Sequence, residues 1–226
     1  MPESTPIIAI DGPGGAGKGT ICRYIARELG WHLLDSGSLY RIVGYAARKH
    51  GLDLQDSSRL AALARNLDVR FAETQDDISI ELEKEDITSL IRTEKAGDDA
   101  SVVATDSAVR AALIDLQRAF AVAPGLVADG RDMGSVVFPG AGLKVFLTAS
   151  VEERARRRYK QLKDKGIDVS LPTLSRDMAE RDRRDSERAI APLRACADAR
   201  VLDSTHLSIQ EVVELIIAWA RKVYVL

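Results

Sequence analysis

The chain has 226 residues, of which 46% are hydrophobic, so it is long enough for one large domain with a sizeable core and is not globally disordered. Its 32 Lys and Arg residues nearly balance its 34 Asp and Glu residues, and the formal net charge is −2. No overall positive field therefore draws the protein to nucleic acid or to an anionic membrane. Its two cysteines, Cys22 and Cys196, lie far apart in the sequence, which excludes a disulfide framework and a Cys-rich zinc site.

Five short apolar runs rich in Val, Ile and Leu are typical of buried strands. They cover residues 7–11, 31–35, 126–129, 144–149 and 200–203. Helical patterns lie between them, for example TICRYIAREL and VEERARRRYKQLKDKG. This alternation predicts an α/β fold with a five-stranded parallel sheet flanked by helices.

Four of the runs carry an Asp at their carboxyl ends: Asp11, Asp35, Asp129 and Asp203. Ligands of parallel sheets bind at the carboxyl ends of the strands, so these carboxylates mark a candidate binding rim. An Asp at such a place is also a common cap of a helix or turn, and some of the four have that role alone.

A glycine-rich loop, DGPGGAGKGT, follows the first run and opens a helix. It fits the pattern G-x-x-x-x-G-K, in which backbone N–H groups and the helix N-terminus hold phosphates and the lysine contacts the β- and γ-phosphates. We predict that the phosphates of a nucleotide, ATP according to the family resemblance described below, bind to Gly12, Pro13, Gly14, Gly15, Ala16, Gly17, Lys18, Gly19 and Thr20.

The loop departs from the usual pattern in one place. Gly19 stands where a Ser or Thr normally follows the lysine, and the hydroxyl comes one residue later at Thr20. No side chain is therefore assigned firmly to a metal ion. The G-K-G-T ending resembles that of nucleoside monophosphate kinases. GTPases are excluded, because their guanine-binding N-K-x-D motif needs an Asn and the only Asn of the chain is Asn66, in RNLD.

One segment interrupts the strand and helix alternation. Residues 67–88 alternate apolar and polar side chains, with turn-like TQDD and EKED between the runs, which predicts a small antiparallel meander. Residues 68–99 contain eleven acidic and four basic side chains, a net charge of −7. Such a surface repels nucleic acid.

Three further stretches carry specificity: DSGSLYR at 35–41, DGRDMG at 129–134 and ERDRRDSERAIAPL at 180–193. Together with the loop and the meander they resemble bacterial cytidylate kinases over nearly the whole chain. The resemblance implies phosphorylation of CMP and dCMP by ATP with Mg²⁺ in the cytoplasm. It also implies one P-loop kinase domain over 1–226, with a CMP-binding insert at 37–104 and a short lid at 154–175.

The acceptor phosphate brings about two negative charges to a γ-phosphate that is itself negative, so several guanidinium groups are needed there. Arg41 and Arg131 each follow a rim strand closely, and the family pattern gives them this role. In the third stretch, one helical face is predicted to carry Arg181, Arg184, Asp185 and Arg188. The resemblance places Arg181, Asp185 and Arg188 on the acceptor nucleotide, with Asp185 accepting a hydrogen bond from a ribose hydroxyl. Arg184 is interpreted as structural. A mixed-charge solvated helix shows the same spacing.

Choice of the base is attributed to Asp132, whose carboxylate accepts from the cytosine N4 amino group and is repelled by uracil O4. Arg110 and Ser101 match the family residues at the remaining edge of the base, although Ser101 alone reads as a helix cap. Ser36 and Tyr40 complete the predicted CMP site. The residues assigned to catalysis are Lys18, Arg41, Arg131 and Arg188; no general base is needed, because a phosphate monoester is already ionised at pH 7.

The lid is predicted to begin with an arginine run, Arg154, Arg156, Arg157 and Arg158, in which the phosphate-contacting member is not identified. The expected partners are ATP and CMP or dCMP, without nucleic acid or membrane, and the chain is expected to be a monomer. Three alternatives remain open at this point: a kinase of UMP, AMP or a non-nucleotide such as shikimate, a non-catalytic ATP-binding regulator, and an RNA-binding module. The arginines argue against the regulator, and the charge argues against RNA.

Overall fold

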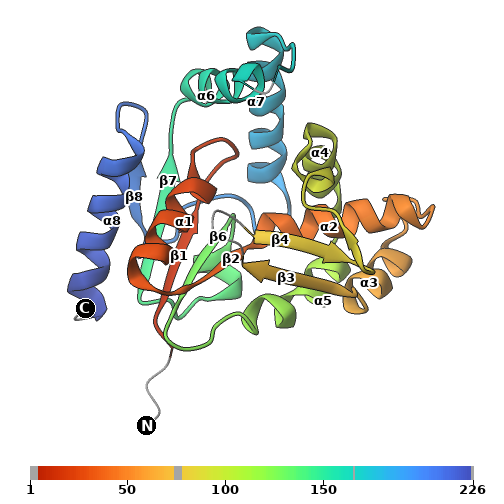
Figure 1. Cartoon of the computed structure of the whole chain (residues 1–226), viewed down its shortest axis with the longest axis horizontal. Coiled ribbons are helices and arrows are strands. Elements are labelled where there is room, and N and C mark those ends of the chain that lie inside the picture. The colour runs from red at the N-terminus through yellow and green to blue at the C-terminus, as the bar shows by residue number, and fades with distance from the viewer. Residues whose placement is uncertain (1–4, 74–77, 165, 225–226) are drawn as a thin grey trace. The chain divides into compact units, whose positions relative to one another are not determined.

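The computed structural model of the protein describes residues 5–73, 78–164 and 166–224 (Figure 1). Two compact units divide the chain. The first, here called the core unit, consists of residues 1–35 and 118–226. The second, the insert unit, consists of residues 36–117 and contains the predicted insert, 37–104.

The core unit contains the predicted five-stranded parallel sheet, in the order β2-β6-β1-β7-β8. The strands are β1 (Ile7–Asp11), β2 (His32–Asp35), β6 (Leu126–Gly130), β7 (Leu143–Thr148) and β8 (Arg200–Asp203). All five predicted runs are confirmed, with ends displaced by at most one residue. Because the chain passes from β6 to the other side of β1 to form β7, the end of β1 is the switch point at which such sheets bind ligands.

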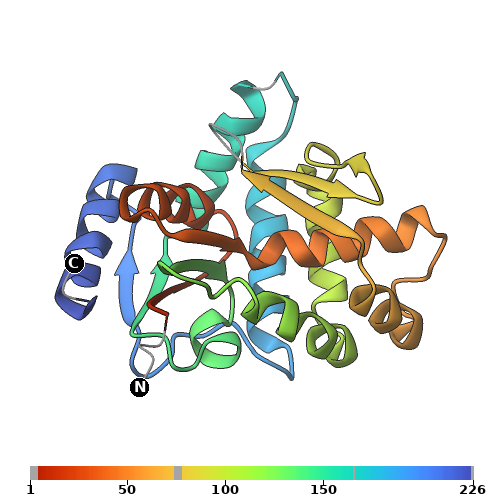
Figure 2. The same cartoon turned by 60° about the horizontal axis from the view of Figure 1, so that its bottom comes forward.

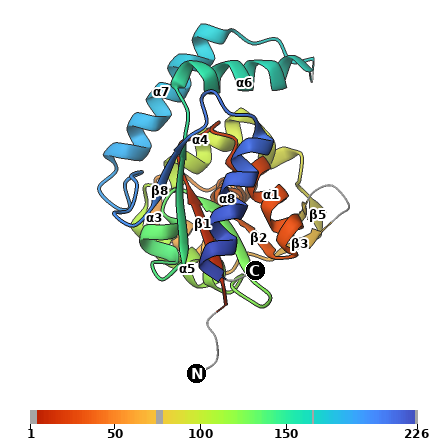
Figure 3. The same ribbon diagram turned by 90° about the vertical axis from the view of Figure 1, so that its left-hand side faces the viewer.

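Two helices cover one face of this sheet, α1 (Lys18–Leu29) and α8 (Ile209–Tyr224), as Figure 3 shows. Their apolar sides join the strands in one core, to which Ile25, Val145 and Ile216 contribute. The C-terminal run VVELIIAWA therefore lies in an amphipathic helix that packs on the sheet. No helix in the described part of the chain is both long and apolar enough to cross a membrane.

The core unit also holds a π-helical turn, η2 (Met133–Val137), and the helices α6 (Val151–Asp164) and α7 (Leu171–Glu187). A small cluster of buried side chains, Ala155, Leu162 and Leu174, joins α6 to α7. The segment predicted as a lid, 154–175, covers most of α6, the connection and the start of α7.

The insert unit combines helices with a three-stranded antiparallel sheet (Figure 2). Its elements are α2 (Ser36–Lys49), α3 (Ser57–Arg65), β3 (Val69–Glu73), β4 (Ile78–Leu82), β5 (Glu85–Asp86), η1 (Leu90–Arg92), α4 (Glu94–Val103) and α5 (Ser107–Arg118). The predicted meander is confirmed, although its TQDD turn, 74–77, lies outside the described residues. Helices α2 and α4 pack closely at Gly44, where an added Cβ would lie 3.0 Å from the Cβ of Asp99.

Candidate active site

The glycine-rich loop connects β1 to α1 at the switch point of the sheet. Gly12 has φ +151°, and a Cβ on it would lie 1.9 Å from the carbonyl oxygen of Leu147 in β7, so only glycine fits. Gly17, with φ 91°, precedes the first residue of α1, Lys18. Strand, loop and helix therefore have the context that phosphate binding requires.

Lys18 is buried beside a carboxylate. Its Nζ donates a hydrogen bond to the carbonyl of Pro13 at 2.9 Å and lies 3.8 Å from Oδ1 of Asp129, at the end of β6. Burial, followed by the nearby charge of Arg131, lowers the pKa of Lys18 to about 8. Burial likewise raises the pKa of Asp129 to about 6, against the opposing effect of Lys18. Burial therefore disfavours the charged forms of both side chains, and the opposite charge of the partner stabilises each of them.

Asp11, the last residue of β1, holds the loop that follows β6. Its two carboxylate oxygens accept hydrogen bonds from the backbone N–H groups of Met133 (2.7 Å) and Gly134 (2.9 Å). Burial raises the pKa of Asp11 to about 6, although both hydrogen bonds favour the charged form. Asp132, which the sequence assigns to base recognition, immediately precedes these two amides and is 3% exposed. One carboxylate therefore joins the strand before the phosphate loop to the segment that carries Asp132.

Arg131 and Asp185 form an ion pair, with Nε of the arginine 3.0 Å from Oδ2 of the carboxylate. Burial disfavours the charged form of Asp185, yet its pKa stays below the usual value because Arg131 lies beside it. Arg181 and Arg188 act in the same direction. A Cβ placed on Gly14 would lie 3.4 Å from Nη2 of Arg131 and 3.9 Å from Nε of Arg181. Two guanidinium groups are thus packed against the phosphate loop.

One detail of the sequence interpretation is wrong. Arg188 is not on the helical face with Arg181 and Asp185, because α7 ends at Glu187 and Arg188 is extended, with φ −61° and ψ 139°. At this end the carbonyl of Asp185 accepts a hydrogen bond from the amide of Leu193 at 2.8 Å instead of from residue 189, and Pro192 bars any helix beyond residue 191. The Nε of Arg188 instead donates to the carbonyl of Ala191.

The other predicted nucleotide-binding residues belong to the insert unit. The guanidinium of Arg110 lies 5.8 Å from the centre of the Tyr40 ring, a cation–π contact between α5 and α2. Arg41 donates from Nη1 to the carbonyls of Ile91 (2.8 Å) and Thr93 (3.1 Å). These bonds tie the Arg41 side chain to the segment around η1.

Ser36 and Ser101 are both buried in the insert unit but differ in their partners. Ser36 donates to Oε1 of Gln117 at 2.7 Å. Ser101 lies inside α4, so it is not a helix cap, and its buried Oγ has no hydrogen-bond partner among the described residues. A buried hydroxyl without a partner is costly, which makes Ser101 a candidate for a ligand contact.

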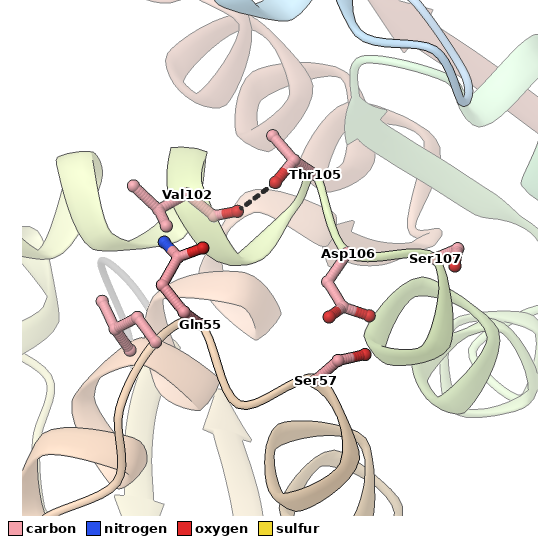
Figure 4. Close-up of a pocket in the computed structure, with 7 residues that line it drawn as sticks. Gln55, Ser57, Val102, Thr105, Asp106 and Ser107 are labelled. Atoms are coloured by element: carbon pink, nitrogen blue, oxygen red, sulfur yellow. Dashed lines mark hydrogen bonds between the residues drawn. The ribbon is translucent and has the colours of Figure 1, made fainter.

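The insert unit has a polar pocket of about 310 Å³, shown in Figure 4. Its lining residues are Leu54, Gln55, Ser57, Val102, Thr105, Asp106 and Ser107. The Thr105 hydroxyl bonds to the Val102 carbonyl, and Asp106 accepts from the amides of Ala108 and Val109 at the start of α5. No predicted site residue lines this pocket, and these two polar groups serve the local structure.

Sequence reasoning gave no role to Gln117 or Asp182, which the structure places beside site residues. It noted Asp129 only as one of four carboxylates on the candidate rim, and Arg154 only as one member of the arginine run. The DGRDMG motif, which begins with Asp129, was the available signal for that residue. In the described part of the chain, no three His, Cys, Asp or Glu side chains cluster as a metal site.

Comparison with known proteins identifies the family. The cytidylate kinase family profile matches residues 8–222. A cytidylate kinase of Pseudomonas paraeruginosa is 58% identical over 96% of this chain and 96% of its own length. Cytidylate kinases of Aeromonas salmonicida and Proteus mirabilis are 52% and 53% identical, over 98% and 99% of this chain and 96% and 99% of their own lengths. Because the profile and these relatives match nearly the whole chain, the chain belongs to the cytidylate kinase family.

Proposed function

We propose that this protein transfers the γ-phosphoryl group of ATP to CMP or dCMP and releases ADP with CDP or dCDP. The observation that carries the proposal is the packing of Arg131 and Arg181 against Gly14 of the phosphate loop, with Arg131 held by Asp185. A nucleoside triphosphate site alone needs no second group of guanidiniums beside the loop. Two adjacent phosphate sites do, because their charges repel each other.

The donor half of the site is the loop from Gly12 to Thr20. Its amides and Lys18 hold the phosphates of ATP, and Lys18 stabilises the charge that moves toward the β-phosphate during transfer. Lys18 is the first residue of α1, and its Nζ turns back to donate a hydrogen bond to the carbonyl of Pro13 in the loop. The ammonium group is thus held at the phosphate loop.

The acceptor half combines arginines with carboxylates. Arg131, Arg181 and Arg188 bind the CMP phosphate from the core unit, and Arg41 is the matching arginine of the insert unit. Asp185 accepts a hydrogen bond from a ribose hydroxyl. Its pKa, lowered by the arginines against the effect of burial, keeps it ionised as an acceptor at neutral pH.

Recognition of cytosine rests on Asp132, Ser101 and Arg110, with Ser36 and Tyr40 completing the nucleotide site. A carboxylate facing the N4 amino group accepts a charge-assisted hydrogen bond, whereas uracil presents an acceptor there. The cation–π contact of Arg110 with Tyr40 and the unpartnered hydroxyl of Ser101 support this role for the insert unit.

The residues beside the loop suit a magnesium ion bound with ATP. A Cβ on Gly19 would lie 3.5 Å from Oδ2 of Asp129, so a carboxylate stands next to the first turn of α1, where Thr20 carries a hydroxyl. Mg²⁺ is typically held by one or two carboxylates together with substrate phosphates and water. When bound, it neutralises charge on the β- and γ-phosphates.

In the reaction, an oxygen of the CMP phosphate attacks the γ-phosphorus in line, and the bond from that phosphorus to the β-phosphate oxygen breaks. The loop amides, Lys18 and the arginines hold the charge of the transition state and align the reacting groups. The attacking oxygen is already ionised at pH 7, so no side chain has to remove a proton.

We also propose that the protein acts as a monomer in the cytoplasm, without nucleic acid or membrane. The formal net charge of −2 and the acidic segment 68–99 support the absence of a nucleic-acid partner.

A coupled assay of ADP formation with CMP, dCMP, UMP and AMP as separate acceptors tests the proposal. Turnover with CMP and dCMP well above that with UMP and AMP is expected. Preference for UMP or AMP would refute the assigned substrate, and binding of CMP by calorimetry without turnover would identify a regulator instead.

A further inference from the structure

Arg154, the first member of the arginine run, is almost completely buried and joins three separate parts of the core unit. Only 2% of its surface is exposed. Its Nε donates to the carbonyl of Ala149 after β7 at 3.0 Å, and its Nη1 donates to the carbonyl of Gly14 at 2.9 Å. Nη1 and Nη2 also bind the two carboxylate oxygens of Asp182 on α7. Arg154 is therefore a junction between α6, α7 and the phosphate loop.

The bond to Gly14 orients a donor of the phosphate loop. A peptide unit is planar and trans, so the carbonyl of Gly14 and the N–H of Gly15 point in opposite directions. Arg154 holds the carbonyl, and the N–H of Gly15 is thereby directed away from Arg154. A Cβ added to Gly15 would lie 3.4 Å from the Cβ of Arg154 and 3.1 Å from Met178 Cε. Side chains of both α6 and α7 therefore pack closely around this peptide.

The bond to Asp182 orients the acceptor side. Asp182 follows Arg181 directly and precedes Asp185 by three residues, so it lies on the turn of α7 that carries both predicted nucleotide contacts. Asp185 in turn binds Arg131. A fixed pair at Arg154 and Asp182 therefore sets the distance between this turn and the phosphate loop.

The neighbouring arginines of the run have different partners. Arg156 is 70% exposed and pairs with Glu153, whereas Arg157 binds Glu153 and the carbonyl of Ser204. The Nη1 of Arg158 donates to Gln161 on its own helix. Of the four, Arg154 is the one that these contacts connect to the loop and to α7.

Given phosphoryl transfer as proposed above, we propose that Arg154, held by Asp182, is a positioning residue that aligns the Gly14–Gly15 peptide of the donor loop with the acceptor groups on α7. The fork of the guanidinium is essential to this role, because it serves two carbonyls and a bidentate carboxylate at once. A lysine carries the same charge but has no planar fork.

The test compares Arg154→Lys, Asp182→Asn and the double variant with Arg183→Lys as the matched control. Arg183 stands on the same helix and pairs with Glu187, but both side chains are 62% exposed. For each protein, kcat, the KM values for ATP and CMP and the melting temperature are measured.

Arg154→Lys and Asp182→Asn are each expected to lower kcat about 10- to 100-fold, because misplacement of reacting groups acts on the transition state. Both KM values should change by no more than about threefold. The double variant should be no slower than the slower single variant, since the two residues act as one unit. Arg183→Lys should match the wild type.

Three results would overturn the proposal. Wild-type kcat in the folded Arg154→Lys variant would show a purely structural residue. A raised KM for ATP in that variant with unchanged kcat, not reproduced by Asp182→Asn, would show a direct phosphate contact. Additive losses in the double variant would separate the two residues.

Failure of the proposed function is recognised separately, as absence of CMP turnover in the wild type. The ratio of variant to wild type is then measured with whichever acceptor of the panel is used. A second measurement needs no acceptor: the change in the amide NMR signal of Gly15 when ADP is added. Compared with the wild type, this change should be smaller in Arg154→Lys and the same in Arg183→Lys. An equal Gly15 shift in all three proteins would contradict the role of Arg154.

Discussion

The ammonium group of Lys18 lies 3.8 Å from the carboxylate of Asp129, and both side chains are buried in the core unit. The pKa values of the two groups are displaced toward each other, that of Lys18 downward to about 8 and that of Asp129 upward to about 6, with burial as the largest cause of both. Pairing preserves the charge of Lys18 at neutral pH. That charge is then available to the phosphates of ATP.

Lys18→Ala is expected to lower kcat by several powers of ten while the protein stays folded, because Lys18 acts on charge that develops during transfer. Lys18→Met retains the apolar stem of the buried side chain and should be equally slow. Steady-state kinetics and circular dichroism check both variants. Turnover near the wild-type value in either would contradict the assignment of the loop.

Arg131→Ala should lower kcat/KM for CMP roughly 100-fold, because it removes a phosphate contact and leaves Asp185 buried without its ion-pair partner. Arg41→Ala should weaken CMP binding and turnover in the same direction. The affinity for ATP, measured by calorimetry, should stay nearly constant in both variants. If ATP affinity falls while CMP binding does not, the donor and acceptor phosphate sites have been exchanged.

Asp132→Asn should reduce the preference for cytosine over uracil. The amide keeps the shape of the side chain but adds an N–H donor that can face uracil O4, and it loses a charge-assisted bond of roughly 1.5–3 kcal/mol to N4. The ratio of kcat/KM for CMP to that for UMP should therefore fall by about 10- to 100-fold. An unchanged ratio would mean that Asp132 does not recognise the base.

The pH dependence of stability should reveal Asp11. Its pKa is raised from 3.8 to about 6 in the folded protein, so the folded state binds more protons between these values and stability falls as the pH rises from about 4 to 6. The fall is at most about 3 kcal/mol. Asp11→Asn should lack this component, so urea unfolding of both proteins from pH 4 to 7 measures it.

Asp56 provides a control of opposite sign. It accepts the N–H of Arg59 at the start of α3, and that hydrogen bond is the largest cause of its lowered pKa. Its contribution is present above its unfolded pKa and is lost as the pH falls. Asp56→Asn should therefore leave the change between pH 4 and 6 in place. Parallel curves for the wild type and Asp11→Asn would contradict the role given to Asp11.

The sheet was predictable because its strands consist of continuous apolar runs, and the central strands β1, β6 and β7 are largely buried. The phosphate loop was predictable because glycines and a lysine at fixed spacing have few other uses. Arg154 was not separable from Arg156 or Arg158, since the difference lies in contacts with Gly14 and Asp182 that are distant in sequence.

Only an outer limit for α7 could be read from the sequence. Pro192 bars a helix beyond residue 191, whereas α7 ends at Glu187, before Arg188. The pairing of Arg131 with Asp185 could not be read from the sequence. The two residues lie 54 positions apart, and they were predicted to bind different groups, the phosphate and the ribose. Only the folded chain shows that these two side chains bind each other.

The anchoring of α6 near its first turn makes the α6–α7 pair a lever with its pivot at Arg154. The cluster of Ala155, Leu162 and Leu174 stiffens the arm. From Arg154 to the last residue of α6, Asp164, the arm is about 15 Å long at 1.5 Å per residue. For an arm of that length, a tilt of about 10° at the pivot would move the tip by about 3 Å. Such a tilt would leave the Gly14 peptide, which lies next to the pivot, almost in place.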